Sequence, residues 1–152
     1  MHILSGDTIR IYSVHLKASN TSPDEAQRAL EVDTLRKYTN ALPIGSNFIV
    51  CGDFNFYRSS ESAYQKLLAV TPGVDGHFID PITMTGTWNN IAYSSYHTQS
   101  PRVRAFGGGS TGGLNDRFDL VLFSNAMMQS GGVTYVNGST FPMGNDGNHY
   151  ND

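Results

Sequence analysis

The chain has 152 residues, 39% of them hydrophobic and 15% charged, with a net charge of −3 and a single cysteine. This balance excludes a disordered chain and favours one globular domain with a sizeable core. The net negative charge excludes a global positive field for nucleic acid, so a polyanion would need a local basic rim or a metal. No stretch approaches the ~18 apolar residues of a membrane span.

The first half of the chain predicts a strand, a helix and a second strand. Residues 8–16 read as a central strand, because apolar residues fall on both faces. A helix follows, with Ser22 as N-cap, Pro23 in the first turn and Glu25 closing a capping box. Residues at helical spacing predict its inward face: Ala26, Ala29, Leu30, Leu35, Tyr38 and Leu42. Residues 47–51 then form a short apolar run that predicts a buried strand.

The second half is less regular. A shorter helix is predicted from Ser59 or Ser60 to about Ala69, and residues 76–116 read as polar loops. Further strands are predicted at Phe78-Ile79, Thr87-Trp88 and Phe118 to Ser124, with Val133 to Val136 as hairpin partner of the last of these. Many Gly, Ser, Thr and Asn residues agree with a β-rich architecture.

The strongest functional signal is the run Cys51-Gly52-Asp53-Phe54-Asn55, which follows the buried strand. In extended backbone, Asp53 and Asn55 point to one face while Phe54 points to the other. A carboxylate can hold a metal or orient a water, and an amide can donate to a phosphoryl oxygen. The alternative is a strand-end turn in which both side chains cap backbone groups, and the sequence leaves the two open.

Other polar residues are weaker candidates. Arg58 is a candidate substrate contact, and Arg102 and Arg104 read as loop charges or phosphate clamps. The run Gly107 to Gly113 reads as a flexible loop, since it lacks the ending of a nucleotide-binding loop. The remaining residues favour structural interpretations: His2, His77 and His97 on the surface or in loops, Asp116 as a loop acid, Trp88 in the core and Cys51 as a small buried hydrophobe.

Three segments together resemble the endonuclease/exonuclease/phosphatase superfamily, the DNase I-like phosphodiesterases. They are Val14-His15-Leu16, Gly52-Asp53-Phe54-Asn55 and Arg117-Phe118-Asp119-Leu120-Val121, in that order. The resemblance covers roughly residues 8–125. It implies an α/β fold, part of a four-layered sandwich in which two mainly antiparallel sheets are flanked by helices.

The same resemblance implies that residues 1–152 are a single partial domain. The family places a metal-binding Glu on a strand ahead of the His15 strand, and it closes the site with Ser-Asp-His near the C-terminus. Neither feature is evident here, although Asp146 and His149 could be a divergent form of the second. We therefore expect little hydrolysis by this chain alone.

By resemblance, the parent protein is a metal-dependent phosphoric ester hydrolase. A nuclease is favoured over a lipid or sugar phosphatase. His15, Asp53, Asn55 and Asp119 would be catalytic, and Asp53 would hold Mg²⁺ or another divalent cation such as Mn²⁺ or Ca²⁺. The substrate would be a phosphate ester, with nucleic acid as one class. The alternative is a non-catalytic, truncated or degenerate domain. The sequence indicates no protein partner and leaves localisation open, with a lean towards a secreted or extracellular bacterial parent.

Overall fold

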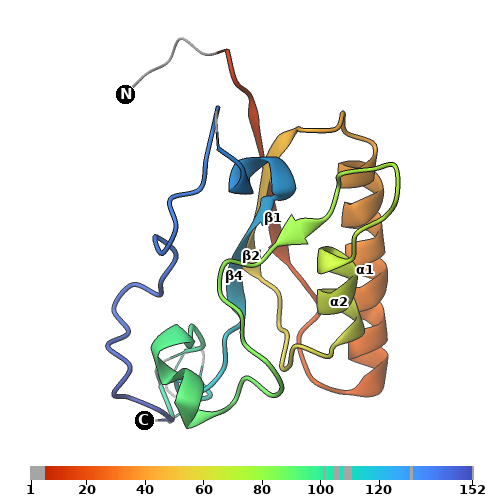
Figure 1. The fold of residues 1–152 in the computed structure, drawn as a ribbon. Coiled ribbons are helices and arrows are strands. Elements are labelled where there is room, and N and C mark those ends of the chain that lie inside the picture. Colours follow the sequence, from red (N-terminus) through yellow and green to blue (C-terminus); the bar gives the residue numbers. More distant parts are fainter. Residues whose placement is uncertain (1–5, 101, 105–106, 108–110, 131, 152) are drawn as a thin grey trace.

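The computed structural model describes residues 6–100, 102–104, 107, 111–130 and 132–151. It is a mixed α/β fold with a four-stranded sheet, and α1 and α2 lie side by side on one side of that sheet (Figure 1). The elements in chain order are β1 (Ile9–His15), α1 (Ser22–Asn40), β2 (Asn47–Asp53), α2 (Ser62–Leu68), β3 (Phe78–Ile79), the 3₁₀ helix η1 (Ile91–Tyr96), β4 (Asp119–Ser124) and the 3₁₀ helix η2 (Asn125–Met128).

The sheet has the strand order β1-β2-β4-β3. β1 and β2 are parallel, and α1 supplies the crossover that a parallel pair requires. β4 is antiparallel to both β2 and β3. The predicted strands at residues 8–16, 47–51, 78–79 and 118–124 are thereby confirmed, with small differences at their ends.

The core lies between the sheet and the two helices. Alternate residues of the central strands point into it, and Phe48, Val50 and Leu122 are fully or almost fully buried. The rings of Phe56, Tyr64 and Trp88 also pack edge to face, with centroids 5.2 to 6.5 Å apart. The core position predicted for Trp88 is confirmed.

The predicted start of α1 is wrong by one residue. The N-cap is Thr21, whose hydroxyl accepts a hydrogen bond from the backbone N–H of Asp24. A capping box from Ser22 therefore does not form, and Glu25 instead binds Arg58 through both carboxylate oxygens. α2 also starts slightly later than predicted, at Ser62.

The predicted inward face of α1 is partly wrong. Ala29 is buried as expected, but Leu30 and Tyr38 are 62% and 65% exposed. Arg28 and Arg36 are buried in their place, and both guanidinium groups donate to acceptors on neighbouring segments.

Two predicted strands do not form. Thr87 makes only an isolated bridge, to Arg58. Residues 133–136 are not a hairpin partner of β4, since η2 follows that strand directly and the N–H of Tyr135 donates to the carbonyl of Met127 at 2.7 Å.

The face of the sheet opposite the helices is more open. The strand register places its residues in rows, and the first two rows that cross β1, β2 and β4 are Ile11–Ile49–Phe123 and Ser13–Cys51–Val121. Ile11 is 69% exposed, whereas Ile49, Cys51 and Val121 are half-buried. Tyr12 and Val14 point the other way and pack against the core.

Because this face is apolar and β1 is an edge strand, we expect the isolated chain to be marginally stable or to self-associate. Replacing Ile11 by lysine should shift the chain towards monomer in size-exclusion chromatography, since a charge at an edge strand opposes further pairing. A wild-type monomer with a cooperative melt at high temperature would contradict this expectation.

Candidate functional site

The third row of the open face is polar. His15 lies opposite Asp53 in the parallel pair, and Asp53 lies opposite Asp119 in the antiparallel pair. Side chains that face one another across neighbouring strands point to the same side of a sheet. The structure therefore brings His15, Asp53 and Asp119 together in one line across β1, β2 and β4.

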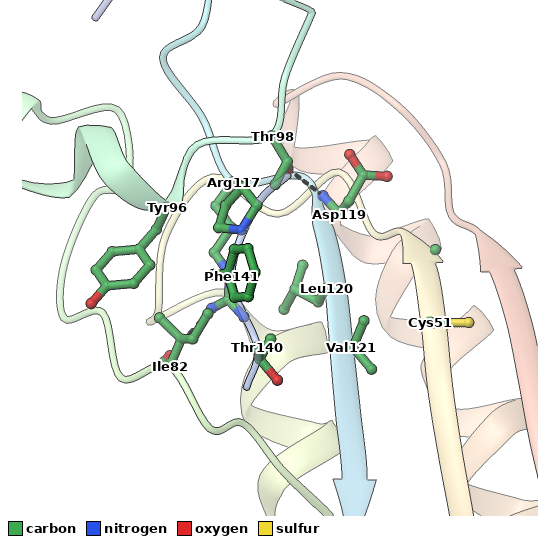
Figure 2. A pocket seen from close by; sticks show the side chains of 12 residues that line it. Cys51, Ile82, Tyr96, Thr98, Arg117, Asp119, Leu120, Val121, Thr140 and Phe141 are labelled. Atoms are coloured by element: carbon green, nitrogen blue, oxygen red, sulfur yellow. Dashed lines mark hydrogen bonds between the residues drawn. The ribbon is translucent and has the colours of Figure 1, made fainter. Parts of the chain in front are cut away.

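The electrostatics of this row follow from its register. The His15 Nε2 atom is 3.7 Å from Asp53 Oδ2, and the His15 side chain is 75% exposed. Loss of hydration raises the pKa of Asp119, and the like charge of Asp53 raises it further. The backbone N–H of Asp119 donates to Thr98 Oγ1 at 2.8 Å, which fixes the start of β4 (Figure 2).

Asn55 lies just beyond the row, in the strand-end turn that was the alternative interpretation and not in extended backbone, while its role on a phosphate stays a prediction. Its backbone is left-handed, with φ at 53°, and its N–H donates to Asp53 Oδ1 at 3.0 Å in a tight turn. Its side-chain amide donates to the carbonyl of Leu16 at 3.1 Å. The motif is thus a capping turn, and Asn55 also lines the same cleft as Asp53 and Asp119.

Gly52 allows β1 and β2 to approach closely beside the row. Its φ is 135°, and a Cβ atom there would lie 2.0 Å from the carbonyl oxygen of Val14. Only glycine fits this position, because any side chain would meet the backbone that carries His15.

Two members of the polar row, Asp53 and Asp119, line a cleft of about 370 Å³. Besides Asp53, Asn55 and Asp119, its walls include Thr98 and Gln99 from the segment after η1. Sequence reasoning missed these two residues, and no local pattern could have found them, because only the tertiary fold brings residues 97–100 beside β4.

A second cavity of about 230 Å³ adjoins the cleft through Thr98 and Asp119. Its other walls are mainly apolar and include Ile82, Tyr96 and Phe141, so the site has a polar part and an apolar part (Figure 2). Cys51 also lines this cavity and is half-buried, so it is less buried than the small buried hydrophobe that the sequence predicts.

The candidate basic residues have other neighbours. The Arg58 Nη2 atom lies 2.6 and 2.7 Å from the two carboxylate oxygens of Glu25, so this guanidinium is held on the surface of α1. The carbonyl of Arg102 accepts from the N–H groups of Gly112 and Gly113, and Arg104 is exposed. Parts of the glycine-rich run, residues 108–110, lie outside the described residues.

Two histidines and one acid are more buried than predicted. His97 is fully buried, with Nε2 at 2.9 Å from the Trp88 carbonyl, and His77 is buried near Asp75. Asp116 is also buried, and loss of hydration raises its pKa to about 6. All three residues lie in loops, as predicted, but in the interior and not on the surface, while His2 lies outside the described residues.

Asp146 and His149 form an exposed pair, with His149 Nε2 at 3.7 Å from Asp146 Oδ2. The backbone N–H of Asn148 donates to Asp146 and lowers the pKa of that carboxyl. Their equivalence to a C-terminal Asp-His stays a prediction.

The donor set of the row suits a hard cation. Carboxylate and amide oxygens are the ligands that Mg²⁺ prefers, and Mg²⁺ often takes only one or two carboxylates, with water and substrate phosphates completing its shell. Asp53 and Asp119 provide two neighbouring carboxylates of like charge. Within the described residues, no group of three or more His, Cys, Asp or Glu side chains could hold a metal ion.

None of the helices described is long and apolar enough to cross a membrane.

Comparison with known proteins gives a distant structural likeness. No family model and no curated protein matches the chain. Among solved structures, truncated TDP2 from Caenorhabditis elegans is similar with a TM-score of 0.44 and 19% sequence identity over 79% of this chain. The match spans 42% of that protein's chain. A likeness at this level carries no argument about function, so the site is interpreted from its own residues.

Proposed function

We propose that the polar row belongs to a metal-dependent phosphoesterase site that hydrolyses phosphate esters, with phosphodiesters first. The observation that supports the proposal is the alignment of His15, Asp53 and Asp119 across three strands, together with the cleft that Asp53, Asn55 and Asp119 line. Hydrolysis of a phosphate ester at such a site needs a cation, a group that orients the attacking water, and hydrogen-bond donors for the phosphate oxygens.

Each residue has a role that its position permits. Asp53 would orient or deprotonate the water that attacks phosphorus in line. Asn55 would donate to a phosphoryl oxygen, and His15 would donate to the phosphate or to the leaving group. Asp119 would hold a histidine from elsewhere in the domain in its working tautomer, as a carboxylate does for an imidazole base. Arg58 would contact the substrate after its release from Glu25.

The cation would be Mg²⁺, with Mn²⁺ and Ca²⁺ as alternatives, and Asp53 would hold it with Asp119 beside it. When bound, it would neutralise charge on the phosphate and on the leaving oxygen.

We further propose that the chain is part of one domain with a two-sheet sandwich architecture. The rows Ile11–Ile49–Phe123 and Ser13–Cys51–Val121, apolar except for Ser13, support this proposal, because an antiparallel sandwich buries such a face against a second sheet. The parent protein would act as a nuclease, and the alternative is a lipid or sugar phosphatase. Its proposed location is secreted or extracellular, in a bacterium.

The proposal is tested by adding dimethyl phosphate and MgCl₂ to ¹⁵N-labelled chain. We expect the Asn55 side-chain amide and the N–H groups of His15, Asp53 and Asp119 to shift together. Asp53→Asn should weaken this response about tenfold, equivalent to about 1.4 kcal/mol, because one charge of the cation site is lost. Asp33→Asn is the matched control, since Asp33 is an exposed carboxylate that pairs with Lys66 on the helical layer.

A spectrum that does not change at any of the four residues would refute the proposed site. Turnover is measured separately with bis(4-nitrophenyl) phosphate. We expect the chain alone to bind the ligand with little turnover. Strong Mg²⁺-dependent turnover would contradict this expectation and would show that the metal has more ligands in this chain than Asp53 and Asp119.

A further inference from the structure

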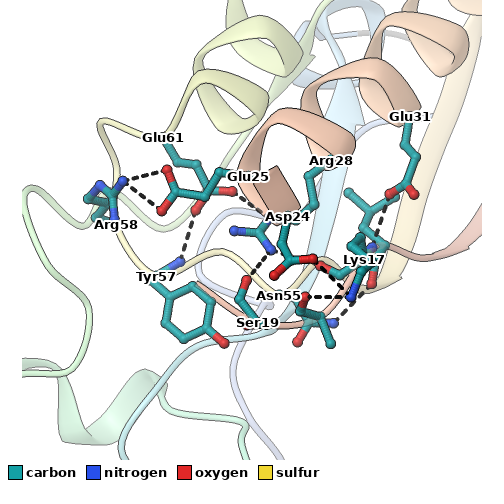
Figure 3. A network of polar contacts seen from close by, with 12 residues as sticks. Lys17, Ser19, Asp24, Glu25, Arg28, Glu31, Asn55, Tyr57, Arg58 and Glu61 are labelled. Atoms are coloured by element: carbon teal, nitrogen blue, oxygen red, sulfur yellow. Dashed lines mark hydrogen bonds and ion pairs between the residues drawn. The ribbon is translucent and has the colours of Figure 1, made fainter. Parts of the chain in front are cut away.

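Arg28 of α1 and Glu61 at the N-cap of α2 form an ion pair (Figure 3). Arg28 Nε donates to Glu61 Oε1 at 2.5 Å, and both side chains are fully buried. Burying two charges is costly, and a buried ion pair is often no more stable than an apolar pair of similar volume. Arg28 Nη2 is also buried without a hydrogen-bond partner in the part of the chain that the structure describes. Stability alone therefore does not account for the pair.

The first set of contacts holds the loop after β1. Arg28 Nη1 donates to the carbonyl of Lys17 at 2.8 Å and to that of Ser19 at 2.6 Å. Ser19 has a left-handed backbone with φ at 82°, which is unfavourable for a residue with a side chain. Between these two residues lies Ala18, which lines the cleft. Arg28 thus fixes the wall of the cleft that follows His15.

The second set of contacts of the Arg28–Glu61 pair reaches the loop after β2 and the loop before β4. Glu61 Oε2 accepts from the backbone N–H of Tyr57 at 3.4 Å, and the Arg28 guanidinium lies 5.7 Å from the centroid of the Tyr57 ring. The Tyr57 ring packs edge to face on Phe118, with centroids 5.0 Å apart. Phe118 lines the cleft and immediately precedes Asp119.

We propose that Arg28 and Glu61 are positioning residues that set the separation of the three segments carrying His15, Asn55 and Asp119. Neither touches the ligand, and both act through the carbonyls of the loop after β1 and through Tyr57. The Asn55 amide reports this arrangement, since it bridges two of the segments by donating to the Leu16 carbonyl. The inference rests on the proposed function in one respect, which is that a phosphate ester occupies the cleft.

The test replaces the pair as a unit. In the double variant Arg28→Met, Glu61→Met, an apolar pair of similar volume fills the site, so the fold should be retained while the bonds to the loops are lost. Arg36→Met is the matched control. Arg36 is also a buried arginine of α1, but it donates to the carbonyls of Lys66, Leu67 and Ala69 at the end of α2.

The readouts are thermal melting, the Asn55 side-chain amide signal without ligand, and the affinity for inorganic phosphate with MgCl₂. The double variant should melt cooperatively, shift the Asn55 signal and bind phosphate at least about tenfold more weakly. Arg36→Met should lower the melting temperature and leave both the signal and the affinity unchanged. A double variant with the wild-type Asn55 signal and wild-type affinity would overturn the proposal.

A conservative variant covers the case in which the double variant does not fold. Arg28→Lys keeps the charge but lacks the planar fork, so it can satisfy Glu61 and no more than part of the loop. It should fold and fall between wild type and the double variant in affinity, and wild-type values for both readouts would refute a positioning role. If wild type itself does not bind phosphate, the proposed function fails, whereas the Asn55 signal of the ligand-free variants still decides on positioning.

Discussion

Gly52→Ala is expected to separate β1 from β2 and to lower the free energy of unfolding by about 3 kcal/mol. The new Cβ would lie 2.0 Å from the Val14 carbonyl oxygen, and the backbone at this position has φ at 135°, which residues with side chains rarely adopt. Neither β1 nor β2 can keep its place, so the His15–Asp53 contact should be lost together with stability. Urea unfolding and the NMR signal of His15 measure the two effects.

Gly45→Ala separates the two causes of that loss. Gly45 has φ at 80°, but no heavy atom lies within 4 Å of a Cβ placed there. In this control, backbone strain alone should lower the free energy of unfolding, by about 1 kcal/mol. Equal losses in the two variants would show that close approach of the strands at Gly52 is unimportant.

Asp116→Asn is expected to stabilise the protein above pH 6. Burial raises the pKa of Asp116 from 3.8 to about 6, while a hydrogen bond from Asn89 acts in the opposite direction. Between these pH values the folded chain keeps a proton that the unfolded chain has released, so the free energy of unfolding falls as pH rises. Above pH 6 the fold bears the full penalty of the buried charge, about 3 kcal/mol, and the neutral amide removes it.

Thermal melts of wild type and Asp116→Asn from pH 4 to pH 8 check this expectation. The two proteins should be similar at pH 4 and should diverge as pH rises through 6. Asp33→Asn again serves as the surface control and should show no such divergence, because Asp33 is exposed. A less stable Asp116→Asn at pH 8 would show that the structure stabilises the charged carboxylate.

The strands were the most predictable part of the fold. Short apolar runs bounded by turn residues identify β2 and β4, and the polar residues at the end of β2 point to the site. The register that aligns Asp53 with Asp119 is a property of strand pairing between distant segments, so no local pattern contains it. The resemblance to a known family suggested the grouping of His15, Asp53, Asn55 and Asp119, and the cleft brings the last three together.

Burial of polar residues was the least predictable part. Hydrophobic periodicity treats arginine as a surface residue, yet Arg28 and Arg36 occupy the inner face of α1. Their acceptors are backbone carbonyls and Glu61, whose positions depend on loops far away in the sequence. For the same reason the burial of His97 was not predictable, since its partner is the carbonyl of Trp88.

The polar row also has a consequence for how the molecule folds. Its three members lie on strands that are separated along the chain by α1 and then by the long segment between β2 and β4. Such non-local pairings form late, because the entropy of closing long loops must be overcome before any contact compensates for it. The two neighbouring carboxylates should further retard the final pairing of β2 with β4 when no cation is present. If Mg²⁺ binds at the row as proposed, refolding should therefore be faster in Mg²⁺, and the site should exist only in fully folded molecules.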